Sequence, residues 1–257
     1  MALRRAIRRP VIMLLCGRRR LALLSLLALA GLVIGGSVAA VGRLSLSARP
    51  LAGRVIALDP GHGSIDSGAT HPESPLAEKE IVLDVAQRLA RLIRRAGGRA
   101  VLTRTDDWES DLPDRAELQR RAGLAEAGRA EVLLSLHVDS HSDPSCRYGQ
   151  IFYHPSSAEG KRLAAALQEE LTRLQPGNYR RATPGNLYLL GCTKIPSVLV
   201  ELGFLSHPEE RRLLNTAAYR EALAEALLRG IVAYLDGKAP KPLRKRPPAS
   251  AAVPRSP

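Results

Sequence analysis

The chain has 257 residues, of which 45% are hydrophobic and 25% charged, enough for a packed core in one or two domains. Aromatic residues make up only 4%, so the core must consist mainly of Leu, Val, Ile and Ala. The net charge of +13 comes from the two ends, because residues 1–50 and 238–257 contain Lys or Arg and no acidic residue. The segment between them is slightly acidic, which argues against nucleic-acid binding.

The first segment of the chain has the pattern of a membrane anchor. Residues 1–20 contain seven arginines and are interpreted as a basic cytoplasmic leader, and residues 21–42 contain no charged side chain. A helix that rises about 1.5 Å per residue crosses a hydrocarbon core of about 30 Å in roughly 20 residues. The sequence therefore predicts a transmembrane anchor at 21–42, which attaches the protein to the cell membrane by a single span.

The positive-inside rule predicts that everything after the anchor lies outside the cytoplasm. A linker is expected at 43–52, and an extracytoplasmic domain at 53–236. The alternative is a cleaved signal peptide, because Ser37 and Ala39 place small residues at the two positions that signal peptidase inspects. In that case the protein would be secreted.

Apolar runs alternate with segments of helical periodicity in residues 53–236. Strands are expected at 54–58, 100–102, 132–136, 150–154, around 187–190 and at 197–200. Helices are expected at 79–96, at about 113–127 and 158–174, and at 217–235. This alternation predicts a single α/β domain with a mixed, largely parallel central sheet and helices on both faces.

The last segment, residues 237–257, is rich in Pro, Lys and Arg and is predicted to be a disordered tail. It is either a solvated end or a segment attracted to anionic wall polymer or lipid. The cysteines leave two possibilities open. Cys146 and Cys192, in the exported domain, can form a disulfide only if their Cα atoms lie within about 7 Å, and free thiols are the alternative.

Two histidines follow predicted strands: His62 in VIALDPGHGSIDSGA and His137 in EVLLSLHVDS. Parallel sheets place their chemistry at the carboxyl ends of strands, and neutral imidazole is a common zinc ligand. Glycines on both sides of His62 permit a sharp turn and close approach of a ligand. The alternatives are a surface position for His62 and a hydrogen-bonded core position for His137.

Two acidic residues extend this pattern. Glu78 stands at the start of the helix after the His62 loop, where it could bind a metal or simply complement the helix dipole. Glu201 follows the apolar run PSVLV, where a carboxylate is costly unless it binds a metal, forms an ion pair or transfers protons. Glu201 is therefore the best candidate for a general base.

Five segments in order resemble the zinc-dependent N-acetylmuramoyl-L-alanine amidases often called amidase 3: LDPGHGSIDSGA, LAEKEIVLDVAQRLA, VLTRTDD, LLSLHVDS and VLVELGFLSHPEERRLL. The resemblance covers roughly residues 53–236. Within that family, NLYLLGCTKIPSVLVELGFLSHPEE is similar to the germination-specific, spore-cortex members.

The resemblance implies roles for individual residues. One Zn²⁺ would be held by His62, Glu78 and His137, with Glu80 as the alternative to Glu78, and Glu201 would be the catalytic glutamate. Arg104 matches a family arginine and is interpreted as structural. Asp66 is expected to hold the His62 loop by local hydrogen bonds.

The resemblance also implies a reaction, which is hydrolysis of the amide between the lactyl group of N-acetylmuramic acid and L-alanine in peptidoglycan. In the germination-type members the product leads to the muramic δ-lactam of spore cortex, with a polysaccharide deacetylase as a partner in the same pathway. Two other functions stay open: a zinc peptidase that cleaves within the stem peptide, and a non-catalytic, membrane-tethered wall-binding protein.

Overall fold

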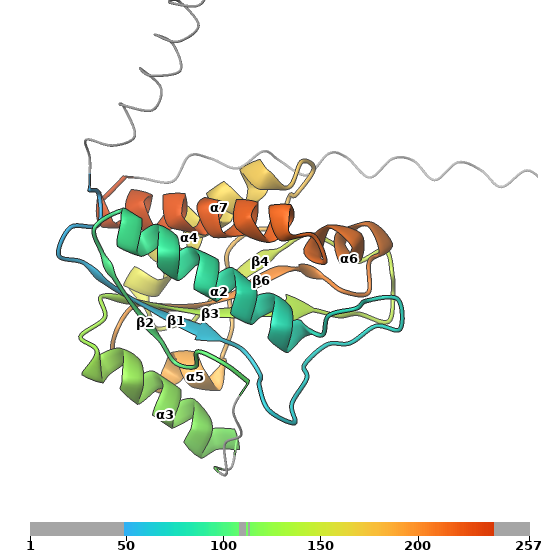
Figure 1. The fold of residues 1–257 in the computed structure, drawn as a ribbon. Helices are drawn as coiled ribbons and strands as arrows, with labels where there is room; N and C mark the ends of the chain where they lie inside the picture. Colours follow the sequence, from blue (N-terminus) through green and yellow to red (C-terminus); the bar gives the residue numbers. More distant parts are fainter. Residues whose placement is uncertain (1–48, 108–111, 113, 239–257) are drawn as a thin grey trace, which may run out of the picture. The chain divides into compact units, whose positions relative to one another are not determined.

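A six-stranded mixed sheet forms the centre of the described part of the chain, residues 49–107, 112 and 114–238 of a computed structural model (Figure 1). The strands follow the order β2-β1-β3-β6-β4-β5. They are β1 (Val55–Pro60), β2 (Arg99–Leu102), β3 (Val132–Asp139), β4 (Gln150–Tyr153), β5 (Thr183–Pro184) and β6 (Ser197–Phe204). Only the pairing of β4 with β6 is antiparallel, so the prediction of a mixed, largely parallel sheet is confirmed.

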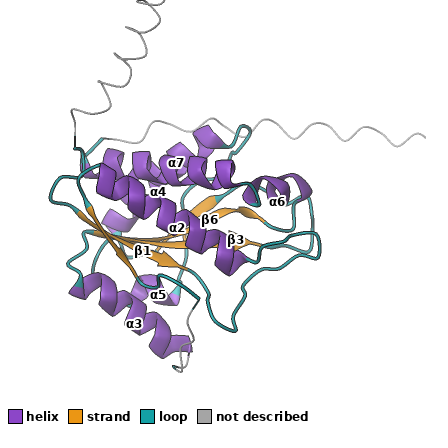
Figure 2. Cartoon of the chain, viewed as in Figure 1, coloured by secondary structure: helices purple, strands orange, loops and turns teal. Residues whose placement is uncertain are grey.

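Helices cover both faces of this sheet (Figure 2). One face carries α2 (Glu78–Arg95), α4 (Ala158–Leu174) and α7 (Ala217–Leu235), with α6 (Pro208–Leu214) adjoining α7. The other face carries α3 (Asp114–Ala127) and the short α5 (Tyr188–Gly191). This arrangement confirms the predicted single α/β domain.

The alternation of side chains along the strands separates two cores. Leu134 and Leu136 of β3 belong to the large cluster that includes Ile81 and Val85 of α2. Leu133 belongs to the smaller cluster under α3 and α5. Since successive strand residues point to opposite faces, His137 leaves β3 on the same side as Leu133. Its Nδ1 nevertheless lies 3.0 Å from Glu78, at the start of α2.

Several predicted elements differ from the structure. The run 187–190 is not a strand, because Tyr188–Gly191 forms α5 and the nearby strand is Thr183–Pro184. An apolar run of four residues fits a buried helical turn as well as a strand, and burial of Leu189 against α3 decides for the turn.

The strands β3 and β6 also run further than predicted, to Asp139 and Phe204, so that His137 and Glu201 lie inside their strands and not at the ends. Helix α6, which the sequence pattern did not indicate, begins at Pro208.

The structure tests the predicted disulfide but not the predictions for the two ends of the chain. Cys146 and Cys192 are free thiols, so the disulfide does not form. No helix within the described residues is both long enough and apolar enough to cross a membrane. The predicted leader and anchor and residues 239–257 of the predicted tail lie outside the described residues.

Candidate metal centre

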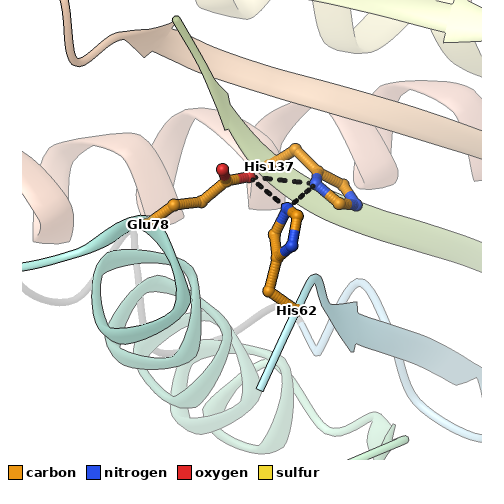
Figure 3. A group of neighbouring side chains, drawn as sticks. All are labelled: His62, Glu78 and His137. Carbon is orange, nitrogen blue, oxygen red and sulfur yellow. Dashed lines mark hydrogen bonds and ion pairs between the residues drawn. The ribbon is translucent and has the colours of Figure 1, made fainter. Parts of the chain in front are cut away.

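His62, Glu78 and His137 bring three donor atoms together beside the parallel strands β1 and β3 (Figure 3). Glu78 Oε1 lies 3.0 Å from His62 Nε2 and 3.0 Å from His137 Nδ1, and the two nitrogens are 3.2 Å apart. Ligand atoms about 2.0–2.1 Å from a tetrahedral zinc ion are themselves roughly 3.3 Å apart. The three side chains therefore fit one face of a zinc site.

Glu80, the alternative ligand, has a different partner. Its carboxylate Oε2 accepts a hydrogen bond of 2.7 Å from the backbone N–H of Ala77 and so closes the first turn of α2. Glu78 is the acidic residue of this helix start that faces the two histidines. The side-chain cluster is thus formed by the residues that the resemblance implied, without Glu80.

The loop after β1 holds His62 in an unusual backbone conformation. His62 and Ser64 have φ angles of 59° and 57°, in the left-handed region that side chains other than glycine rarely adopt. Gly63 and Asp66 close a tight turn by two backbone hydrogen bonds of 3.0 and 3.1 Å. Asp66 Oδ2 lies 2.7 Å from His62 Nδ1, so the expected local contact is present and Nε2 is directed toward Glu78.

Two glycines make room for the cluster. A Cβ atom on Gly61 would lie 2.3 Å from Cε1 of His137. A Cβ atom on Gly68, whose φ is 64°, would lie 2.5 Å from Glu78 Oε2. Gly68 is a residue that sequence reasoning missed, since only the folded loop shows how near it comes to the carboxylate.

Two buried arginines hold the backbone of this loop. Arg104 donates to the carbonyls of Pro60 and Gly61 at 3.0 and 2.8 Å. Arg121 donates to the carbonyls of Pro60 and His62 at 3.0 and 2.9 Å. The structural interpretation of Arg104 agrees with these contacts. Arg121 was missed, because the α3 sequence contains no sign that its partners lie some 60 residues earlier.

The hydrogen bonds from these arginines to the loop connect to a buried polar network around Asp59. The carboxylate of Asp59 accepts hydrogen bonds from Thr103 at 2.6 Å and from Ser135 at 2.7 Å. Arg121 adds an ion pair at 3.2 Å. Buried polar groups that are fully hydrogen-bonded fix one geometry, so this network ties β1, β3 and the residue after β2 to α3.

The carboxylate of Glu78 is held by the backbone as well as by the histidines. Its Oε2 accepts from Ala69 N–H at 2.7 Å, and its Oε1 accepts from Val138 N–H at 2.9 Å. Burial opposes ionisation, but the hydrogen bonds from His137 and His62 hold the pKa of Glu78 well below its usual range. Burial likewise opposes the charged form of His62, yet Glu78 and then Asp66 raise the pKa of His62 to about 9. The site therefore attracts positive charge.

Glu201 lies on β6 opposite His137 on β3, so both side chains project from the same face of the sheet. Its Oε2 is buried and has no hydrogen-bond partner among the described residues. Burial, with smaller contributions from Asp139 and Glu78, raises the pKa of Glu201 to about 8. A buried carboxyl group with such a pKa can accept and return a proton near neutral pH.

The fold and this cluster define a class: an α/β protein in which two histidines and one carboxylate beside the parallel strands form a group that could hold a metal ion, with three ligands as in open, catalytic sites. A family model described as N-acetylmuramoyl-L-alanine amidase, Amidase 3, matches residues 56–233. The chain therefore belongs to the Amidase 3 family of N-acetylmuramoyl-L-alanine amidases, and it is a peptidoglycan hydrolase.

Individual relatives agree with this assignment. The germination-specific N-acetylmuramoyl-L-alanine amidase of Bacillus subtilis is 32% identical over 204 residues, which cover 75% of this chain and 84% of the relative. The amidase AmiA of Escherichia coli is 28% identical over 226 residues, covering 70% and 76% of the two chains.

Two solved structures have the same fold. The CwlD amidase of Clostridioides difficile, solved in complex with the GerS lipoprotein, is 33% identical, with a TM-score of 0.66 over 72% of this chain and 100% of that one. The amidase AmiC2 of Nostoc punctiforme is 31% identical, with a TM-score of 0.64 over 72% and 99% of the two chains.

Proposed function

We propose that this amidase works with one zinc ion held by His62, Glu78 and His137 and with Glu201 as its general base. The observation that carries the proposal is the triangle of donor atoms, with sides of 3.0, 3.0 and 3.2 Å, next to a carboxyl group that has an unpartnered buried oxygen. Two imidazoles and one carboxylate are a common ligand set for catalytic zinc.

The bond cleaved under this proposal joins the lactyl carbonyl of N-acetylmuramic acid to the amino group of L-alanine. Zinc bound at this site supplies a Lewis acid that acidifies water and polarises the scissile carbonyl. Glu201 Oε2 accepts the proton of the attacking water and then delivers it to the departing amine. Asp66 keeps Nδ1 of His62 protonated, so that Nε2 presents a lone pair to the metal.

Digestion of purified peptidoglycan tests the bond and the metal together. Residues 49–238, with and without a chelator, are incubated with the polymer and the products are identified by mass. The proposal expects intact stem peptides with L-alanine at their new amino terminus, release that stops on chelation, and recovery on adding Zn²⁺. Cleavage inside the stem peptide would instead identify a peptidase, and no release at all would favour a wall-binding protein.

For the biological role, we propose spore cortex maturation or germination, with a polysaccharide deacetylase acting in the same pathway. The similarity to the germination-specific amidase of Bacillus subtilis supports this role. The test is the muropeptide profile of spores from a strain without this gene. Loss of muramic δ-lactam, restored by the wild-type chain but not by Glu201→Gln, is expected. An unchanged profile would contradict the role and leave the amidase activity unaffected.

For the location, we propose a catalytic domain outside the cytoplasm, attached to the cell membrane by residues 21–42. The arginine-rich leader and the uncharged 22-residue stretch support this topology. External protease added to protoplasts should degrade the catalytic domain and leave the cytoplasmic leader protected. A domain recovered entirely in the medium would indicate cleavage after the apolar stretch instead.

A further inference from the structure

The face of the sheet that carries the catalytic residues continues beyond Glu201 onto β4. Glu201 is paired with His137 of β3 on one side and with Gln150 of β4 on the other. Paired residues on neighbouring strands project from the same face, so these three side chains form one row. The next row along the strands contains Leu199 of β6 and Phe152 of β4, and both are partly exposed.

Arg180 lies at the β4 end of the catalytic row. Its Nη1 donates to Gln150 Oε1 at 2.7 Å, and its Nε donates to the carbonyl of Arg147 at 2.9 Å. The guanidinium carbon stands 5.0 Å from the ring centroid of Phe204. Phe204 pairs with Asp139 of β3, so it belongs to the same face as the catalytic row. Arg180 is thus held by Gln150, which pairs with Glu201, and it lies over Phe204.

Among the residues that the structure describes, no carboxylate forms an ion pair with Arg180. Arg181, the next residue, is exposed. A half-buried guanidinium that is held rigidly and lacks a counter-ion is suited to binding a carboxylate of a ligand.

We propose that Arg180 binds a carboxylate of the stem peptide and so selects substrates whose peptide is acidic near the scissile amide. This inference rests on the proposed amidase function. Neighbouring strands are about 4.8 Å apart, so Gln150 lies about 10 Å from His137, a span that two or three extended peptide residues cover. A carboxylate on the second residue of the stem peptide would therefore be within reach, and Leu199 and Phe152 provide an apolar surface beside it.

The test compares two glycan-linked tripeptide substrates, one with a free carboxylate on the second residue and one with that group converted to an amide, both amide-capped at the end. For wild type, the free acid is expected to have a KM about tenfold lower. Arg180→Gln should raise KM for the acid about ten- to hundredfold, with little change in kcat and no change for the amide. Arg180→Lys should restore part of the preference. Arg91→Gln, at an exposed arginine of α2, is the matched control and should behave as wild type.

Two results would overturn the proposal. One is an equal effect of Arg180→Gln on both substrates, which would indicate a structural role, and the other is a wild-type enzyme that does not distinguish them. A binding experiment distinguishes failure of this proposal for Arg180 from failure of the proposed amidase function. Free tripeptide is titrated into the Glu201→Gln protein with and without Arg180→Gln. Binding that depends on both Arg180 and the free carboxylate is expected even if neither substrate is cleaved, and equal binding by both proteins would refute the role of Arg180.

Discussion

Gly61 and His137 touch across β1 and β3 so closely that the imidazole occupies the space of a side chain at position 61. A Cβ there would lie 2.3 Å from Cε1 of the ring and 2.7 Å from its Nδ1. The ring cannot move aside without carrying Nδ1 away from Glu78, 3.0 Å distant. The glycine therefore fixes the position of a proposed metal ligand.

Replacement of Gly61 by alanine should displace the imidazole of His137 and lower zinc affinity about 10- to 100-fold, with a parallel loss of activity. Competition with a chromophoric chelator measures the affinity. Gly123→Ala is the control, because a Cβ there has nothing within 4 Å and the position lies inside α3. That variant should gain up to about 1 kcal/mol of stability. Unchanged zinc affinity in Gly61→Ala would contradict the proposed role of His137.

Asp66→Asn tests the partner of His62. An amide cannot favour the Nδ1-protonated ring as a carboxylate does, so zinc affinity should fall about 10- to 100-fold. Stability should change little, because Asp66 is largely exposed. Asp143→Asn, in an exposed loop away from the cluster, is the control. Equal zinc affinity for the wild type and Asp66→Asn would show that the 2.7 Å contact does not orient the ligand.

Arg121→Met removes the donor to two loop carbonyls and the ion pair with Asp59. Since these acceptors are buried, we expect a loss of about 3 kcal/mol in the free energy of unfolding. Zinc affinity should fall as well, because the backbone of His62 loses its support. Urea titration measures the first effect. Arg162→Met removes an exposed pair with Glu159 and an exposed cation–π contact with Tyr234, and it should cost at most about 1 kcal/mol.

Glu201→Gln should abolish most activity, about 10²- to 10⁴-fold, and yet stabilise the metal-free protein at alkaline pH. The pKa of Glu201 is raised to about 8, from 4.5. Between these values the folded state binds more protons than the unfolded state, so stability falls as pH rises through this window. The neutral amide removes this dependence. Its advantage should be about 1–3 kcal/mol at pH 9 and absent below pH 4.

Thermal unfolding in the presence of chelator, at pH values from 4 to 9, measures this prediction. The curve for wild type should decline relative to that of Glu201→Gln across the window. Parallel curves would show that the carboxyl group of Glu201 is solvated and titrates normally. That result would leave its role as a base to be judged from the activity alone.

Much of this protein could be predicted from its sequence because the relevant signals are local. Apolar runs and helical periodicity identified β1, β3 and α2 within a few residues, since burial of one face imposes that periodicity. His62 and His137 stood out because each follows a predicted strand in the sequence, and Glu201 because it interrupts an apolar run. The five ordered segments then indicated the family.

Other features depended on the three-dimensional structure because they join residues that are far apart in sequence. Arg121 donates a hydrogen bond to the carbonyl of His62, which lies about 60 residues earlier in the sequence. The helical state of 188–191 follows from packing against α3. The resemblance favoured Glu78 over Glu80, but only the structure shows that the Glu80 carboxylate turns back to Ala77 while that of Glu78 lies beside the two histidines. Gln150 lies beside Glu201 because β4 pairs with β6, and Arg180 reaches this position through its hydrogen bond to Gln150. The path of the whole chain sets this pairing. Local sequence determines which side chains are available, whereas long-range packing determines which of them meet.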